Sequence, residues 1–171
     1  MVIDDVLKRV NAPKGSFYHY FPSKDAFVSA AIDAYADYFA QKLDPHFQNT
    51  HLTPLARLDA FVEDACMGIE RHHFTRGCLV GNLGQEIACL EPAMCARLQA
   101  IFRDWEHRLG ECLDAAKQAG EMAADCDSAA LAHAFWIGWE GAVLRARLEK
   151  SIAPLQVFLA LYLQALPRKS S

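Results

Sequence analysis

The stretch Val10–Lys24 constrains the fold of this chain more than any other part, because Pro13 and Pro22 divide it into short pieces. A proline lacks a backbone donor and restricts the residue before it, so a preceding helix should end before the Asn-Ala-Pro turn. Lys14–Tyr20 is then predicted as a short helix between two breaks. Ser23 is a suitable N-cap for a further helix. Two helices joined by a turn of a few residues are typical of a helix-turn-helix.

The predicted short helix carries hydrogen-bond donors and aromatic rings on the face that should be exposed. Backbone amides near the start of a helix can also bind a phosphate. The residues predicted to contact DNA, including one lysine in the first turn of the next helix, are Lys14, Gly15, Ser16, Tyr18, His19 and Lys24. The aromatic residues can alternatively form only a small core. We assign that role to Phe17 and Phe21, and DNA contact to Tyr18.

Residues 13–27 resemble the recognition-helix signature of TetR-type transcriptional regulators; they read Pro-Lys-Gly-Ser-Phe-Tyr-His-Tyr-Phe-Pro-Ser-Lys-Asp-Ala-Phe. The resemblance implies an all-helical homodimer whose N-terminal head binds a palindromic double-stranded DNA operator and whose body responds to a small-molecule inducer. In that family, the helix predicted over Ile3–Val10 is covered by a longer first helix. The sequence begins where that first helix should have ended. We therefore expect either a fragment or a start assigned too late, with an incomplete head.

Charge and composition agree with a regulator that touches DNA at one end. The chain has a net charge of −4, but residues 1–24 hold four Lys or Arg and two Asp, a net +2, leaving −6 for the rest. A basic end on an acidic body suits local DNA contact. No apolar run approaches the roughly 18 residues of a membrane span. With no secretory leader, the six cysteines are expected as free thiols in a reducing cytoplasm.

The rest of the chain is predicted as helices separated by proline, glycine and aspartate. The expected segments are a helix from Ser23 to Leu43 ended by Asp44-Pro45, a helix from Pro54 to about His73, an irregular Thr75–Gly84, a short helix around Leu83–Cys89, and long helices over Pro92–Gly120, Ser128–Lys150 and Leu155–Leu166. We therefore predict an all-α chain. Residues 1–43 would form the truncated helix-turn-helix head with its linking helix, and residues 44–171 a helical ligand-binding and dimerisation domain.

The last two predicted helices are apolar on nearly every side. Such a helix should be buried on every side, and in a small domain a partner copy is the simplest cover. We predict a dimer through Ser128–Lys150 and Leu155–Leu166. The alternative is a fully internal helix in a monomer.

The glycine-rich stretch from Arg76 to Leu90 can hold Cys78 near the mouth of a cavity. Its Gly-Cys-Leu tripeptide, with a second cysteine eleven residues later, resembles the electrophile-sensing branch that represses N-ethylmaleimide reductase. Related branches answer to small unsaturated acids or their thioesters. The resemblance implies that Cys78 is the sensor, assisted by a lysine for which Arg147 stands here. Alternatively, Cys78 is a small buried hydrophobe. The predicted ligand or sensor residues are Cys78, Trp105, Trp139 and Arg147.

The sequence contains no motif that would indicate an enzyme or a metal site. It lacks a Gly-rich phosphate loop, a Gly-x-Ser-x-Gly elbow, a His-Glu-x-x-His motif and any Cys-x-x-Cys pair. No catalytic residue, cofactor or metal ligand is predicted. We predict a repressor released from DNA by a small reactive or unsaturated molecule. The alternatives are a helical small-molecule-binding dimer that has lost DNA binding with its first helix, and a small helical enzyme.

Overall fold

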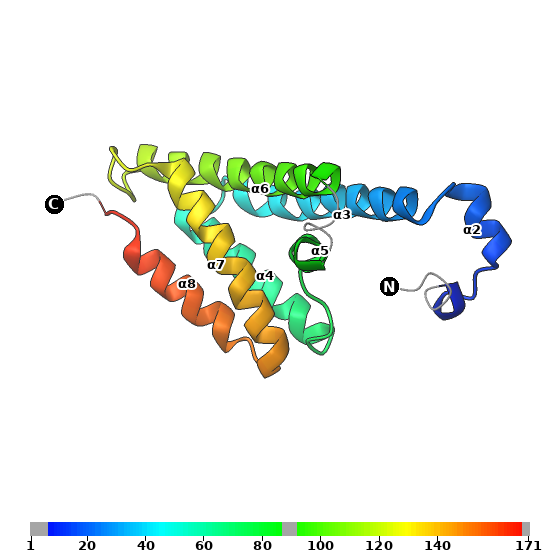
Figure 1. Ribbon diagram of the computed structural model, residues 1–171. Coiled ribbons are helices and arrows are strands. Elements are labelled where there is room, and N and C mark those ends of the chain that lie inside the picture. The colour runs from blue at the N-terminus through cyan, green and yellow to red at the C-terminus, as the bar shows by residue number, and fades with distance from the viewer. Residues whose placement is uncertain (1–6, 87–91, 169–171) are drawn as a thin grey trace. The chain divides into compact units, whose positions relative to one another are not determined.

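A computed structural model describes residues 7–86 and 92–168 of the chain (Figure 1). Its named helices are α2 Lys14–Tyr20, α3 Lys24–Phe47, α4 Pro54–Arg71, α5 Leu79–Glu86, α6 Pro92–Gln118, α7 Ser128–Glu149 and α8 Ala153–Ala165. Over the described residues there is no strand, and the predicted all-α class is confirmed. No helix in these ranges is long and apolar enough to cross a membrane. The predicted helix Ile3–Val10 lies partly outside the described residues, and residues 7–9 of it are helical.

Internal contacts group the residues into two compact units, Met1–Tyr38 and Phe39–Ser171. The predicted linking helix corresponds to α3, which contributes residues to both units. We describe each unit by itself.

The first unit holds α2 between the two predicted breaks. Phe17 is 6% exposed and packs against Phe21 and Phe27, with ring centroids 5.5 and 5.3 Å away. Edge and tilted aromatic pairs at these separations are favourable. The Ser23 hydroxyl accepts a hydrogen bond from the Ala26 amide at 3.0 Å, as predicted for an N-cap. Phe17 and Phe21, the two residues assigned to a core, therefore pack α2 against the start of α3 through Phe27.

The prediction that α3 stops at Asp44-Pro45 is wrong, because the helix runs on to Phe47. Pro45 falls in the last turn, where its missing amide removes only one helical hydrogen bond. The chain compensates at the helix end. Arg57 donates from Nη1 to the Phe47 carbonyl at 3.0 Å, and Arg108 forms an ion pair with Asp44. Tertiary contacts thus extend the helix past the proline.

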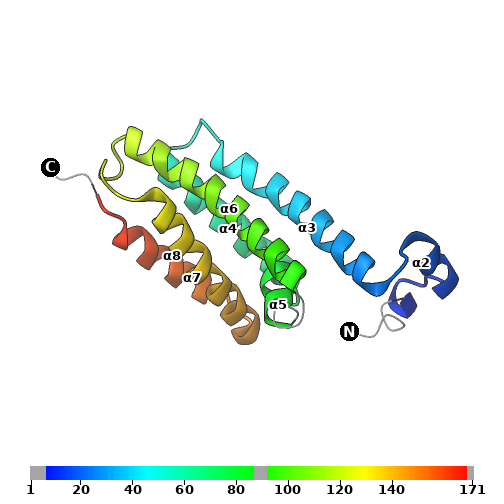
Figure 2. The same cartoon turned by 45° about the horizontal axis from the view of Figure 1, so that its top comes forward.

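The second unit is built around aromatic side chains from α3, α4, α6 and α7. Trp105 of α6 is fully buried, with its ring 4.4 Å from that of Phe39 and 5.2 Å from that of Trp136. Phe61 of α4 packs against Trp139 of α7 at 5.2 Å. Figure 2 shows α4, α6 and α7 running close together around this core.

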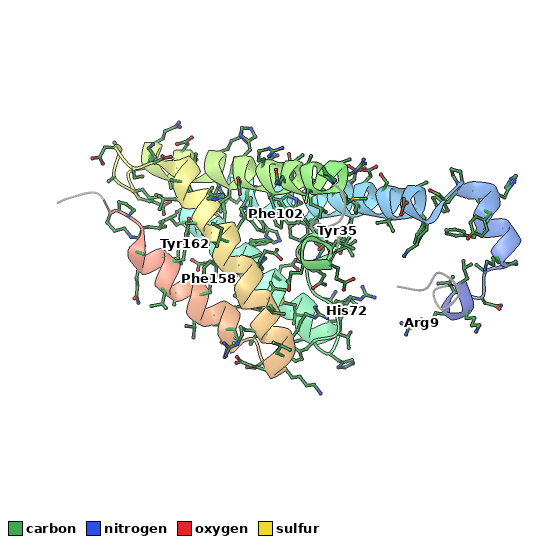
Figure 3. The ribbon with its side chains drawn as sticks, viewed as in Figure 1. Arg9, Tyr35, His72, Phe102, Phe158 and Tyr162 are labelled. Atoms are coloured by element: carbon green, nitrogen blue, oxygen red, sulfur yellow. The ribbon has the colours of Figure 1, made fainter. Side chains whose placement is uncertain are left out.

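Helix α8 packs along α7 through aromatic rings. Phe158 and Tyr162 lie on the side of α8 that meets α7 (Figure 3), and both contact the Phe135 ring, at 5.3 and 5.1 Å. The Phe158 ring fits over Gly138, where an added Cβ atom would lie 2.2 Å from it. Glycine at this position therefore allows the two helices to approach closely.

Within this chain, α8 is not buried on every side as its composition predicted. Leu155 is fully buried, but Val157 and Leu161 are 57% and 60% exposed. On α7, Ile137 and Leu148 are likewise 64% and 71% exposed. We call the exposed apolar residues of the two helices the α7/α8 apolar surface; they are Ile137, Leu144, Leu148, Val157 and Leu161.

The segment before α6 differs from the prediction of an irregular Thr75–Gly84 followed by a helix over Leu83–Cys89. Helix α5 begins earlier, at Leu79, and includes Gly81 and Gly84. Glycine disfavours a helix interior by about 1 kcal/mol relative to alanine, so tertiary packing must stabilise α5. The end of the predicted helix, with Cys89, lies outside the described residues.

Candidate functional site

Helix α2 presents polar side chains away from the core of its unit. Lys14, Gly15, Ser16, Tyr18, His19 and Lys24, the residues predicted to contact DNA, are all exposed. Since consecutive residues turn by 100° around a helix, Gly15 and His19 lie opposite the buried Phe17. Tyr20, which the sequence analysis left unassigned, is 75% exposed beside them. The surface fits contact with a duplex, and DNA contact by each residue stays a prediction.

No residue that the structure describes explains a glycine at position 15. Its φ is not in the left-handed region, and a Cβ atom added there would meet nothing within 4 Å. A glycine in a helix carries an entropic cost, so alanine would be expected at this position on stability grounds alone. Close approach of an external backbone, such as a DNA phosphate at the helix start, would account for it.

The second unit contains a cavity of about 470 Å³ between α6 and α7. Its apolar walls include Phe102, Trp136 and Ile137. The polar residues that line it are Gln99, Arg103, Glu106, His133 and Glu140. Glu106 and His133 contact each other, with 2.8 Å between Oε1 and Nδ1. Although five of the eight lining residues are polar, most of the surface that they expose to the cavity is apolar, as is usual in a small-molecule site.

Glu140 joins this cavity to the start of α5. Its Oε2 lies against Gly81, where an added Cβ would be only 1.9 Å away. Its carboxyl also interacts with the Cys78 thiol, and the Gly81 amide donates to Cys78 Sγ at 3.4 Å. Burial raises the pKa of Glu140 above its ordinary value. A cavity-lining acid is therefore in contact with the predicted sensor cysteine.

The environment of Cys78 holds its thiol protonated. Burial raises the pKa of Cys78 strongly, and the nearby Glu140 carboxylate raises it further. The ionisable group in contact with the thiol is Glu140, and the assisting role that the resemblance implies for Arg147 stays a prediction. Arg147 does reach this segment: its side chain covers Gly77, and Nη1 donates to Asn82 Oδ1 at 3.2 Å. It positions the loop and α5.

Trp105 and Trp139, predicted to border the pocket, belong to the aromatic core and do not line this cavity. The tryptophan that does is Trp136. The sequence analysis missed both Trp136 and Glu140. A usable pattern was present, because Glu140 is the only charged residue in the apolar run 134–144 and follows Trp136 by one helical turn.

Two further cysteines, Cys66 and Cys112, fit a structural role. Both are buried and carry free thiols. Burial raises the pKa of Cys112 to about 11. No group of three or more metal-binding side chains occurs in the part of the chain that the structure describes.

An outward-facing donor helix, joined through α3 to a helical body with a cavity, defines a DNA-binding regulator of the helix-turn-helix class. Residues 2–31 match the family model described as bacterial regulatory proteins, tetR family, and residues 54–162 match the tetracyclin repressor-like C-terminal domain. The chain belongs to the TetR family of bacterial transcriptional regulators.

Several regulators are similar to this chain along most of its length. It is 50% identical over 156 residues to the transcriptional regulator AcuR of Cereibacter sphaeroides, which covers 91% of this chain and 71% of that protein. It is 28% identical over 160 residues to the repressor NemR of Escherichia coli, covering 94% and 80%. NemR is thus among its relatives, in agreement with the predicted resemblance.

Solved structures agree with these similarities. The regulatory protein TetR from Rhodobacter sphaeroides has a TM-score of 0.93 at 47% identity, covering 97% of this chain and 88% of that one. The reduced form of Escherichia coli NemR has a TM-score of 0.83 at 25% identity, covering 100% and 89%. The fold and the general role in transcription are therefore shared.

Proposed function

We propose that this regulator represses transcription as a homodimer on a palindromic operator, and that a small molecule bound in its body releases it. The observation that supports the DNA part is that every predicted contact residue is exposed, and that all of them except Lys24 lie on α2, where Phe17 is buried behind them. Such a helix can enter the major groove, with half-sites about 34 Å apart or a multiple of that distance.

The contact residues are assigned different tasks. Lys24 begins α3 and contacts a phosphate, while Tyr18 and His19 read base edges and the first amides of α2 bind the backbone. A phosphate contact carries no sequence information. Lys24→Ala should therefore weaken binding to all DNA about equally and reduce the salt slope by about 1. His19→Ala should mainly reduce discrimination between operator and random DNA.

The experiment is selection of palindromic DNA from a random pool, followed by titration of both variants on the selected and a scrambled duplex. Distinct losses for the two variants support the assignment. Equal losses on both duplexes would contradict it. Failure of the wild-type chain to select any sequence would favour the alternative of a ligand-binding dimer without DNA binding.

The partner for the dimer is a second copy of this chain, seated on the α7/α8 apolar surface. Ile137, Leu144 and Leu148 recur at spacings of seven and four on α7, and Val157 and Leu161 at four on α8, so each set lies on one helical face. Exposed apolar stripes of this kind mark interaction surfaces. Packing two such helix pairs together gives a four-helix interface.

The inducer site is the α6/α7 cavity. The protonated state of Cys78 and its contact with Glu140 support a molecule that binds without a covalent bond in this conformation. A thiolate, the form that reacts with electrophiles, would require the segment before α5 to open first.

A further inference from the structure

Two polar atoms beside the α6/α7 cavity, Trp136 Nε1 and Glu140 Oε1, are buried and have no hydrogen-bond partner among the residues that the structure describes. Trp136 is only 2% exposed, and both residues line the cavity. They lie one turn apart on the same face of α7. Buried polar groups nearly always have partners, so two unmet groups at one cavity require an explanation.

The chemistry of these groups indicates what would satisfy them. The indole of Trp136 can only donate a hydrogen bond. Glu140 sits in an apolar setting that favours its neutral form, and a neutral carboxyl also donates one proton. Arg103 adds a guanidinium to the same lining, while Glu106 is engaged with His133. A ligand matching this set must offer acceptor atoms.

We propose that the cavity binds a small organic molecule through a carboxylate or carbonyl oxygen, which accepts hydrogen bonds from Trp136 Nε1 and the Glu140 carboxyl while its apolar part packs on Phe102 and Ile137. This proposal rests on the proposed function and names its inducer class. A cationic amine is disfavoured, because it would leave the Trp136 donor unmet and require an ionised Glu140.

Glu140 also gives the cavity a route to α5. Its second oxygen is pressed against Gly81 and its carboxyl interacts with Cys78. A ligand that draws the carboxyl further into the cavity would move Oε2 away from Gly81 and the carboxyl away from Cys78. The start of α5 would then lose this contact with α7, while the hydrogen bond from Arg147 to Asn82 remains. Occupancy is thereby converted into a loosening of α5.

Binding of an acid should depend on pH through Glu140. The other titratable or charged groups around it are Cys78 before α5, Arg103 and Glu106 on α6, and His133 and Arg147 on α7. Since the bound complex holds the proton on Glu140, affinity for a carboxylate should fall as pH rises through the pKa of Glu140.

The test is calorimetric titration of the full chain with unbranched carboxylates from propionate to hexanoate, and with the matching primary amides and amines. Carboxylates and amides should bind and amines should not. Trp136→Phe should weaken binding about tenfold, as expected for a lost hydrogen bond. Glu140→Gln keeps a donor and should bind carboxylates within about threefold of wild type, but without the pH dependence.

Glu149→Gln makes the same change at an exposed site on α7 and should bind like wild type. Binding of amines alone, of no probe at all, or an unchanged affinity in Trp136→Phe would each overturn the proposal. A chain that binds acids but selects no DNA would overturn the proposed function and leave the ligand class standing.

Discussion

Oε2 of Glu140 on α7 lies so close to the backbone of Gly81 on α5 that a Cβ atom at residue 81 would be 1.9 Å from it. No side chain other than hydrogen fits without moving the carboxyl. Gly81 is therefore required by a contact between two helices and not by its own backbone conformation, which is ordinary helix.

Gly81→Ala should destabilise the protein by about 1–3 kcal/mol, the usual effect of overpacking. Gly84→Ala is the matched control, three residues further along α5, where an added Cβ meets nothing within 4 Å. That change should stabilise by about 0.5–1 kcal/mol through helix propensity. Urea unfolding measures both. Equal effects of the two substitutions on the free energy of unfolding would mean that the Glu140 side chain moves aside without a measurable cost.

The raised pKa of Glu140 makes stability depend on pH. Because the folded state holds this proton more tightly than the unfolded state, where the pKa is about 4.5, the full contribution is present below 4.5 and is lost as pH rises through the folded pKa. Glu140→Gln removes the ionisation. The variant should gain stability relative to wild type as pH is raised from 4 to 8 in denaturant titrations. If the difference in the free energy of unfolding between the variant and wild type stayed constant from pH 4 to 8, ionisation of Glu140 would not affect stability.

Cys78 should react slowly with N-ethylmaleimide in the folded protein. Each unit by which the pKa rises reduces the thiolate fraction about tenfold, and both burial and Glu140 raise it. Peptide mass spectrometry after brief treatment, with and without denaturant, measures the protection. At a pH above the pKa of Glu140, where its carboxylate is charged, Glu140→Gln should speed labelling by removing one of the two causes. Labelling of Cys78 before Cys66 and Cys112 in native protein would instead support the electrophile-sensor interpretation.

Gly15→Ala separates stability from DNA binding. The added methyl meets none of the described residues within 4 Å, so the head should keep or slightly increase its stability, by up to about 1 kcal/mol. If a phosphate approaches the start of α2, the same methyl should weaken operator binding by about tenfold. Thermal unfolding and DNA titration of one preparation provide both quantities. Unchanged DNA affinity would remove Gly15 from the interface.

Leu161→Asp should dissociate the proposed dimer, because it would bury a charge against the partner copy. Leu161 is 60% exposed in one chain, so the monomer should remain folded. Phe158 is unsuitable for this test because its ring packs inside the protomer against Phe135. Met67→Asp on α4, at a residue 48% exposed, is the control. Light scattering decides: a wild-type monomer at micromolar concentration would contradict the dimer.

Helix boundaries that depend on a single residue could be predicted from the sequence. Pro13 and Pro22 bounded α2 correctly, and Asp127 caps α7 by accepting from the Ala130 amide at 3.0 Å. The same reasoning failed at Pro45, where a contact with Arg108 from a helix far along the chain stabilises Asp44. It also misplaced α5, whose glycines suggested an irregular loop.

The residues that line the cavity could not be predicted from the sequence for a related reason. Periodicity placed Trp105, Trp139 and Trp136 alike on apolar helices, but only the packing of α6 against α7 decides which ring faces the open space. No role was predicted for Glu140. Its partner Gly81 is 59 residues away in the sequence, and no local pattern connects the two.

The Glu140–Gly81 contact predicts that these two positions covary among homologous sequences. A homologue with a side chain at position 81 should have a shorter side chain than glutamate at position 140. Without that second change, α5 would be displaced. The two positions should therefore change together, with glycine retained wherever the acid is. The same holds for Gly77 and Arg147, where an added Cβ would lie 2.6 Å from the arginine Cδ. Chimeras that exchange α7 between relatives without the segment before α5 should fail at these two pairs first.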